Sequence, residues 1–446
     1  MTLKEIIKTF LTNVDKYFVR KKDAGNLGKH YSVIIDFSKS NPGEMISYAD
    51  DVDRAPMSLD WFDILGLKLC VLKDGKVLYY LNPDNVAKQI NGAAADITTL
   101  GNDVMLEVPR MGTNCMWINQ DKLKITITTA PNRAGYDYRA FSLHKYNDCD
   151  KIYIGRYEAY ATGNKLYSSS GRDPIGTGVL TDYRSYGVNR GTGYTDIGIC
   201  DNILLQCLYC LIVRHFDSQT RVGRGICDDG GRHYTGEANT FGWLNTKSAN
   251  KTDGRKAICC LGIENLWGNV AVWEDGITKT STDGVYMAQY ADQYNTNGTG
   301  YEYIGQMTWS PTQTATTQGS YTARIAGLPK FIFMPNADSV NAANLSSTTY
   351  MCDRNAILGA TFTWSVLGNP WCYGSQGGMF NRELLNGTNP PGACGTRLVY
   401  KHVEGGGCLT LLIILSLNQM QPPKQLHLLS LSVSRCNPLE GCIFSQ

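Results

Sequence analysis

Residues 261–277 read LGIENLWGNVAVWEDGI and carry the densest pattern in the chain. Trp267 and Trp273 lie six residues apart, Gly268 and Asn269 stand between them, and an acidic residue follows the second tryptophan. Tryptophans at this spacing can belong to a chemical site, to a ligand platform or to a core. The rest of the chain decides among these three interpretations.

Composition and charge exclude some classes of protein. The 446 residues suffice for two or three domains, each with its own core. A formal charge of +2 without a block of like charge does not suggest a nucleic-acid partner. The 46 glycines and 26 tyrosines, with abundant Asn and Thr, are typical of a turn-rich protein that presents aromatic surface. We therefore expect a mainly β protein with long loops.

The cysteines and the apolar segments near the two ends of the chain indicate whether it is exported or inserted into a membrane. The 15 cysteines are odd in number and include the adjacent Cys259 and Cys260, so they predict free thiols rather than a disulfide framework. Cys207 and Cys210 form a C-x-x-C without a second pair, which favours buried helix cysteines over a zinc site. Charges within the first eight residues argue against a signal peptide, and the longest apolar run, 409–417, is too short to span a bilayer.

The first half of the chain predicts a helix followed by strands. Residues 1–25 include TLKEIIKTFLTNVDKYF, whose heptad spacing suits either a short coiled coil for oligomerisation or a helix packed on its own domain. Residues 26–148 read as a β-rich attachment domain. Within it, YSVIIDF and the alternating KLKITITT predict strands, and Asp74-Gly75 between apolar runs predicts a hairpin.

A second domain is expected over residues 149–402. Its segment DNILLQCLYCLIV is apolar on every face from Ile203 to Val213, which predicts a buried helix with Asp201 or Asn202 as N-cap. Residues 403–446 contain only four charged residues and no recognisable signals for the start or end of a helix or strand. This atypical tail reads as a small apolar appendage or as the product of a shifted reading frame, and we expect it to be poorly ordered.

Three segments together resemble one protein family. GIENLWGNVAVWEDG, the upstream IGRYEAY and the later PWCYGSQGGMFNRELLNGTNPPGACGTRLVY are similar to the formylglycine-generating-enzyme branch of the C-type lectin fold, over roughly residues 150–402. The likeness is closer to a subset, the receptor-binding tail-fibre proteins of gut phages that are diversified by retroelements. LKDGKVLYYLNP and ADITTLGNDVMLEVPRMG in the N-terminal region resemble those proteins too.

The resemblance implies roles for individual residues. Asp353 would begin a variable segment at about 350–400, with scaffold positions at Trp371, Gly374, Gly378, Phe380, Leu384, Gly395, Arg397 and Leu398. The varied, ligand-facing positions would be Cys372, Tyr373, Gln376, Asn381, Arg382, Glu383 and Leu385. The sequence departs from the family pattern in two places. Gly368-Asn369-Pro370 replaces the paired glycines before the tryptophan, and residues 403–446 follow the position near Lys401 at which family members tend to end.

Catalytic alternatives find less support in the residues. Copper-dependent oxidation needs two converging thiolates, and Cys352, Cys372 and Cys394 lie in no motif of that chemistry. His215 and His233 read as loop or helix-end residues. The acidic turn at 228–230 lacks the alternating spacing of an EF-hand loop. We therefore expect no catalytic residue, no metal and no cofactor.

The resemblance implies a phage tail receptor-binding protein. It would bind a host surface protein or glycan and other tail proteins, form a homotrimer in the virion, and neither bind nucleic acid nor insert into a membrane. A structural tail subunit without receptor contact is the alternative. In the family pattern the opening stretch reads as core, with Val270 and Val272 on one strand face, Trp273 largely buried and Trp267 at least half buried.

Overall fold

The computed structural model describes residues 28–49, 51–145, 147–176, 178–246, 248, 251–279, 284–306, 320–325, 333, 345–358, 364–385 and 393–402. The predicted N-terminal helix within 1–25 and the tail at 403–446 lie outside these residues. Strands dominate the described chain, which confirms the mainly β prediction.

The largest sheet has seven antiparallel strands. It contains a hairpin, strands 68–73 and 76–82, that turns at Asp74 and Gly75. The φ values of these two residues, 49° and 74°, give the left-handed turn predicted from the sequence. In spatial order the strands are β14 (Tyr194–Asp196), β26 (Leu398–Lys401), β11 (Lys151–Gly155), β6 (Asp103–Pro109), β3 (Lys68–Lys73), β4 (Lys76–Asn82) and β5 (Asn85–Gln89).

A four-stranded antiparallel sheet contains the predicted strands YSVIIDF and KLKITITT. Leu123, Ile125 and Ile127 are each 1% exposed, so the apolar alternation marks the buried face as predicted. In spatial order the strands are β2 (Ile46–Tyr48), β1 (His30–Asp36), β8 (Lys122–Thr128) and β7 (Gly112–Trp117).

A six-stranded mixed sheet carries the opening stretch and the predicted variable segment. Its inner strand β24 pairs in parallel with β22 and antiparallel with β23, so it has neighbours on both sides. In spatial order the strands are β21 (Ser320–Tyr321), β22 (Arg354–Leu358), β24 (Arg382–Leu385), β23 (Trp364–Leu367), β17 (Ala271–Glu274) and β25 (Cys394–Gly395).

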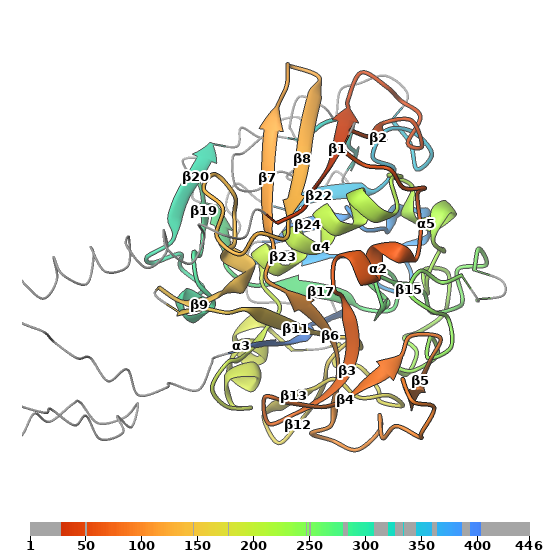
Figure 1. The fold of residues 1–446 in the computed structure, drawn as a ribbon, viewed down its shortest axis with the longest axis vertical. Helices are drawn as coiled ribbons and strands as arrows, with labels where there is room; N and C mark the ends of the chain where they lie inside the picture. The colour runs from red at the N-terminus through yellow and green to blue at the C-terminus, as the bar shows by residue number, and fades with distance from the viewer. Residues whose placement is uncertain are drawn as a thin grey trace, which may run out of the picture. The chain divides into compact units, whose positions relative to one another are not determined.

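Helix α4 (Ile199–Ile212) is the buried helix predicted from the sequence, and it lies at the centre of the view in Figure 1. Cys207 and Cys210 are fully buried on it, as predicted. The predicted N-cap is wrong by three or four residues. Gly198 is the N-cap, and Asp201 at the third helical position accepts a hydrogen bond from the Gly198 N–H at 3.0 Å.

The remaining elements are short. The other helices are α2 (Asp60–Ile64), α3 (Leu180–Val188) and α5 (Ser218–Arg221), with 3-10 turns η1 (Arg139–Phe141), η2 (Ala291–Gln293) and η4 (Gly374–Gln376). A three-stranded sheet comprises β18 (Ile277–Lys279), β19 (Gly284–Met287) and β20 (Glu302–Gln306). Two-stranded ladders join β9 (Ser142–His144) to β10 (Asn147–Asp148), β12 (Tyr160–Thr162) to β13 (Lys165–Tyr167), and β15 (Cys259–Cys260) to β16 (Ile263–Glu264).

The two tryptophans of the opening stretch are core residues. Trp267 is fully buried in the larger apolar cluster with α4, where its ring meets Tyr209 edge-on and its Nε1 donates to the Gly223 carbonyl at 3.0 Å. Trp273 is 2% exposed and belongs to a second cluster with Tyr183. Both burial predictions are confirmed, and the stretch packs into two cores at once.

The division expected at residue 148 falls within one folded unit. In the seven-stranded sheet β6 pairs with β11 from Lys151↔Pro109 to Gly155↔Met105, and β11 pairs in turn with β26 near residue 400. The larger apolar cluster likewise contains residues from Val33 to Val399. Residues on both sides of the expected boundary therefore share a sheet and a core.

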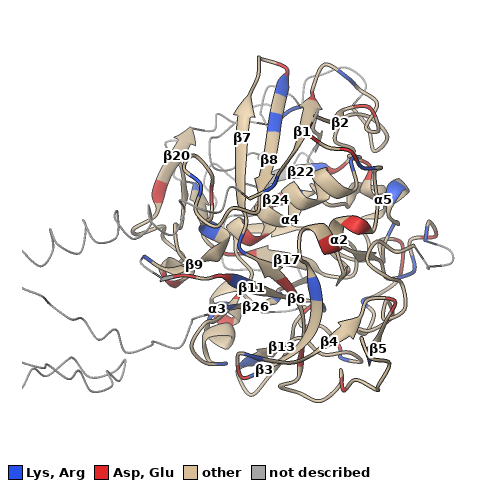
Figure 2. Ribbon diagram, in the orientation of Figure 1, with Lys and Arg blue, Asp and Glu red and all other residues tan. Residues whose placement is uncertain are grey.

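Thiols and charges follow the sequence predictions. The twelve cysteines within the described ranges are all free. Figure 2 shows basic and acidic residues intermixed along the described ribbon, in line with the near-balanced charge of the sequence. None of the helices that the structure describes is both long and apolar enough to cross a bilayer.

Candidate functional site

The seven residues predicted to face a ligand fall into two structural settings. Cys372 is exposed, and Tyr373 and Gln376 are partly exposed, on a surface segment at residues 371–376 that we call the display loop. Asn381, Arg382 and Glu383 are 1%, 1% and 7% exposed at the start of strand β24. Leu385 ends that strand, and its side chain lies outside the described part of the chain.

The turn before the display loop has left-handed backbone at two successive residues. Gly368 and Asn369 both have positive φ, 87° and 56°. Asparagine tolerates the left-handed region better than other residues with a side chain. Asn369 therefore takes a left-handed backbone conformation that is also open to glycine.

The display loop is held through its main chain. The Trp371 N–H donates to the Asn269 carbonyl at 3.1 Å, and the Trp371 carbonyl accepts from the Asp229 N–H at 3.2 Å. The Gly374 N–H donates to the Cys227 carbonyl at 2.9 Å. Gln219 on α5 donates through Nε2 to the carbonyls of residues 374 and 377, at 2.9 Å each. Scaffold groups thus fix the path of the loop without using its side chains.

The chain leaving the loop is fixed in the same manner. Gln206 on α4 donates to the Met379 carbonyl at 3.0 Å, and the Met379 N–H donates to the Ser218 hydroxyl at 3.1 Å. Asp353 accepts from the Phe380 N–H at 2.7 Å. A Cβ at Gly378 would lie 2.0 Å from the Asp353 carboxylate, so glycine is required there.

The loop side chains themselves are uncommitted. Cys372, Tyr373, Ser375 and Gln376 make no side-chain hydrogen bond to the described residues. Trp371 differs because its ring packs against a small buried cluster that includes Ile226 and Cys259. Apart from Gly374, the loop therefore consists of one packed aromatic residue, Trp371, and four residues whose side chains make no hydrogen bond to the described fold.

Asn269 of the opening stretch joins the display loop to a second surface segment. Its φ is 64°, its Oδ1 accepts from the His233 N–H at 2.7 Å, and its Nδ2 donates to the His233 carbonyl at 3.2 Å. The same Nδ2 donates to buried Glu158, and the main-chain carbonyl receives Trp371. One left-handed asparagine therefore fixes the spacing of both segments.

Glu158 lies beneath Asn269 in a fully buried polar network. Its carboxylate accepts from Asn269, from Asn265 at 3.3 Å and from the Val270 N–H at 3.1 Å. Desolvation raises the pKa of Glu158 to about 7, against the opposing effect of the Arg397 guanidinium. Arg397 in turn donates to the Arg156 and Glu264 carbonyls, which ties the network to the residue after strand β11 and to strand β16.

The second surface segment, residues 224–237, carries paired charges and an exposed aromatic. Arg224 pairs with Asp228, and His233 lies 2.7 Å from Asp229 and 3.2 Å from Glu237. Tyr234 is 64% exposed. His233 is a loop residue, as predicted, and its neighbouring carboxylates are engaged by side chains of this chain. Within the described ranges no group of His, Cys, Asp and Glu has the arrangement of a metal site.

The β24 residues are committed to the core. Arg382 forms a two-pronged ion pair with Glu274 at 2.9 and 2.8 Å, and Ser365 donates to the same carboxylate at 2.5 Å. Glu383 pairs with Arg354 at 3.3 Å. Asn381 donates to the Arg354 and Gln376 carbonyls. These three side chains are not available at the surface.

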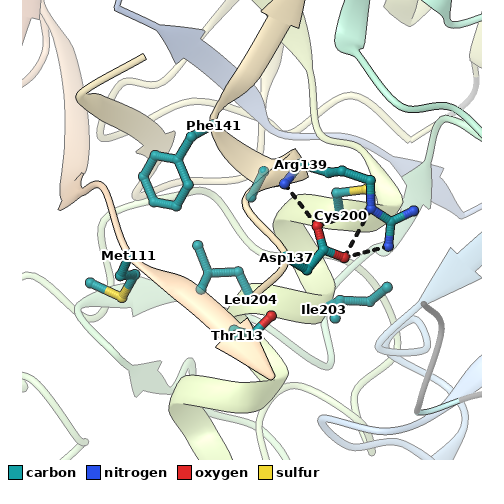
Figure 3. A pocket seen from close by; sticks show the side chains of 9 residues that line it. Met111, Thr113, Asp137, Arg139, Phe141, Cys200, Ile203 and Leu204 are labelled. Carbon is teal, nitrogen blue, oxygen red and sulfur yellow. Dashed lines mark hydrogen bonds and ion pairs between the residues drawn. The ribbon is translucent and has the colours of Figure 1, made fainter. Parts of the chain in front are cut away.

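Among the described cysteines, the three of the predicted variable region do not form an activated pair. Burial raises the pKa of Cys352 and of Cys394, so neither thiolate is favoured, and Cys372 is the exposed one of the three. Cys200 and Arg139 line a separate cavity of about 10 Å³, and their side chains lie close together in Figure 3. Arg139 is bound to Asp137 by three hydrogen bonds, and burial raises the pKa of Cys200 to about 11. This cavity is too small for an organic substrate.

Sequence reasoning missed the residues that hold the loop. Gln206 interrupts an otherwise apolar helix face, and a polar residue buried in such a face needs a specific partner, so it was the detectable signal. Ser218, Gln219 and Glu158 gave no comparable signal because their partners lie far away in sequence.

The sequence was also compared with known proteins. No protein-family model matches this chain, and no curated protein matches it.

Proposed function

We propose that this protein is a receptor-binding protein of a phage tail, which presents the display loop to a host surface protein or glycan. The observation that carries the proposal is the main-chain attachment of residues 371–376, which leaves the side chains at 372, 373, 375 and 376 free to vary. A rigid scaffold under a variable short loop is the arrangement that recognition proteins use.

We further propose that residues 149–402 have a C-type lectin fold of the formylglycine-generating-enzyme type. The sequence resemblance supports this assignment, as does the position of the G-N-V-x-x-W segment beneath the loop. The fold alone would not imply binding. The argument for binding rests on the loop, where Tyr373 is partly exposed and Tyr234 on the adjoining segment is exposed, since tyrosine gives large contact area at small entropic cost.

The proposal includes a place in an assembly. The protein would reside in the virion as a homotrimer bound to other tail proteins, and several copies would convert weak single contacts into firm attachment. Neither a metal nor a cofactor enters this account.

A four-position variant tests the proposal. The full-length chain carrying Cys372→Ser, Tyr373→Ala, Ser375→Ala and Gln376→Ala should fold as the parent does and lose binding to whole cells in a panel of gut bacterial strains. The matched control is Tyr303→Ala on β20, which removes an exposed tyrosine outside the loop and should leave binding unchanged.

Two outcomes separate the alternatives. If the parent binds cells and the four-position variant binds them equally, the display loop is not the receptor site. A parent that binds no strain while it co-assembles with tail proteins would favour the structural subunit. The coding DNA provides an independent check, because retroelement diversification requires a near-duplicate template repeat with adenine-specific mismatches and a reverse transcriptase gene nearby.

A further inference from the structure

A second small cavity lies between α4 and the six-stranded sheet. It measures about 10 Å³ and is lined by Asn202, Gln206, Leu266, Val272, Leu367, Met379 and Arg397. Each of these side chains is 9% exposed or less. Four of the seven are apolar and three are strongly polar, so the cavity differs from an ordinary packing defect.

Each polar residue of the lining has one buried atom without a hydrogen-bond partner in the described structure. The atoms are Asn202 Nδ2, Gln206 Oε1 and Arg397 Nε. Gln206 is oriented by its bond from Nε2 to the Met379 carbonyl, so its oxygen is the atom left over. Arg397 uses both terminal nitrogens on main-chain carbonyls, which leaves its Nε–H. Three unsatisfied polar atoms around one cavity would together cost several kcal/mol.

The lining selects the chemistry of an occupant. Two N–H donors and one carbonyl acceptor match a water molecule, which accepts two hydrogen bonds and donates one. A cation is disfavoured by the Arg397 guanidinium, and an anion is disfavoured by the fixed Gln206 oxygen. The volume also suits one water, since a site needs roughly 10–15 Å³ and two to four polar partners.

We propose that one structural water occupies this cavity and bridges Asn202, Gln206 and Arg397. It joins helix α4 to Arg397 at a cavity that is also lined by Met379, where the chain leaves the display loop. Desolvation lowers the pKa of Arg397 to about 10, and a bound water would return part of the solvation that the guanidinium has lost. The inference does not depend on receptor binding.

The inference can be tested by a crystal structure of the full chain whose electron density resolves other water molecules that are buried as deeply as this cavity. The expected result is one density peak at about 2.7–3.2 Å from all three atoms. Oxygen-17 relaxation dispersion in solution should count one more long-lived internal water in the parent than in Asn202→Leu, which removes a donor and fills the space. Cys210→Ala, on the same helix but not in the lining, should keep the parent count.

Three results would overturn the proposal. The first is an empty cavity in a map that shows other internal waters. The second is direct pairing of Gln206 with Arg397. The third is a halide, recognised by an anomalous peak after bromide soaking. Because the parent map decides the question, a failure of Asn202→Leu to fold would not leave it open.

Discussion

Only five residues separate the display loop at 371–376 from strand β24 at 382–385, yet the fold holds the two segments in opposite ways. Scaffold groups hold the loop by its main chain, and four of its side chains make no hydrogen bond to the described residues. In β24 the side chains carry the attachment, through Arg382 with Glu274 and Glu383 with Arg354. Adjacent segments of one motif can therefore differ completely in their tolerance to substitution.

The difference shows where variation is compatible with folding. An inner strand loses a buried ion pair or packing with almost any change, whereas a loop fixed by its carbonyls and amides keeps those bonds when a side chain at 372, 373, 375 or 376 is replaced. The predictions below test this contrast from its largest expected effect to its smallest.

Replacement of Arg382 should cause the greatest loss. Arg382→Met leaves Glu274 buried and uncompensated, so we expect the free energy of unfolding to fall by about 3–5 kcal/mol. Urea denaturation of the full chain measures the loss. The double variant with Glu274→Leu should recover much of it, because both charges are then gone. A single variant that loses less than about 1 kcal/mol would show that β24 is not committed to the core.

Glu158 should make the scaffold sensitive to pH. Its pKa of about 7 in the folded protein lies above the 4.5 of an ordinary glutamate, so the folded protein holds a proton that the unfolded chain releases. This contribution is complete below pH 4.5, falls by on the order of 3 kcal/mol as the pH rises to 7, and is constant above that. Unfolding free energies of the parent and Glu158→Gln, measured across this range, should converge at low pH; parallel curves would contradict the assignment.

Asn269→Ala should weaken the support of both surface segments. The substitution removes the donor to Glu158 and the contacts with His233, at a cost of about 2 kcal/mol for the buried group left unsatisfied. Asn269→Gly is the control, since it removes the same bonds but accepts the φ of 64° without strain. Alanine should be the more destabilising of the two, and amide exchange should quicken at Trp371 and His233 in both. Unchanged exchange at these amides would exclude the proposed link.

Much of the fold could be predicted from local sequence. Asp74-Gly75 predicts its hairpin, the alternation at Leu123, Ile125 and Ile127 predicts a buried strand face, and the apolar residues on either side of Gln206 in α4 predict a central helix. Each signal resides within a few residues.

The rest depends on contacts that no local pattern encodes. Arg382 looks like a surface charge because its partner, Glu274, is 108 residues away. The N-cap at Gly198 was missed because glycine has no capping side chain. The Asp201 carboxylate, at the third helical position, accepts a hydrogen bond from the Gly198 N–H and also pairs with Lys401, which is far away in sequence. The expected division at residue 148 fails to separate two cores for the same reason: β11 pairs with β6 and with β26, whose residues lie far from it in the chain.

Cys372→Ser should produce the smallest effect on stability. Cys372 is the exposed thiol among the described cysteines, so its loss should remove one rapidly reacting group in a thiol titration of the folded protein. The free energy of unfolding should change by no more than about 0.5 kcal/mol. Cys394→Ser, at a buried position, is the matched control and should leave the rapid phase intact. A Cys372→Ser protein with the full rapid phase would place that thiol away from solvent.

The most direct test of the account is a complete substitution scan of residues 371–385 in the full-length chain, read out by resistance to proteolysis. We predict that positions 372, 373, 375 and 376 accept nearly all residues with parental stability, whereas 378, 380, 382 and 384 accept few. A profile in which β24 tolerates substitution as well as the display loop, or in which the loop tolerates it as poorly as β24, would contradict the claim that the fold holds this loop by its main chain and leaves its side chains free.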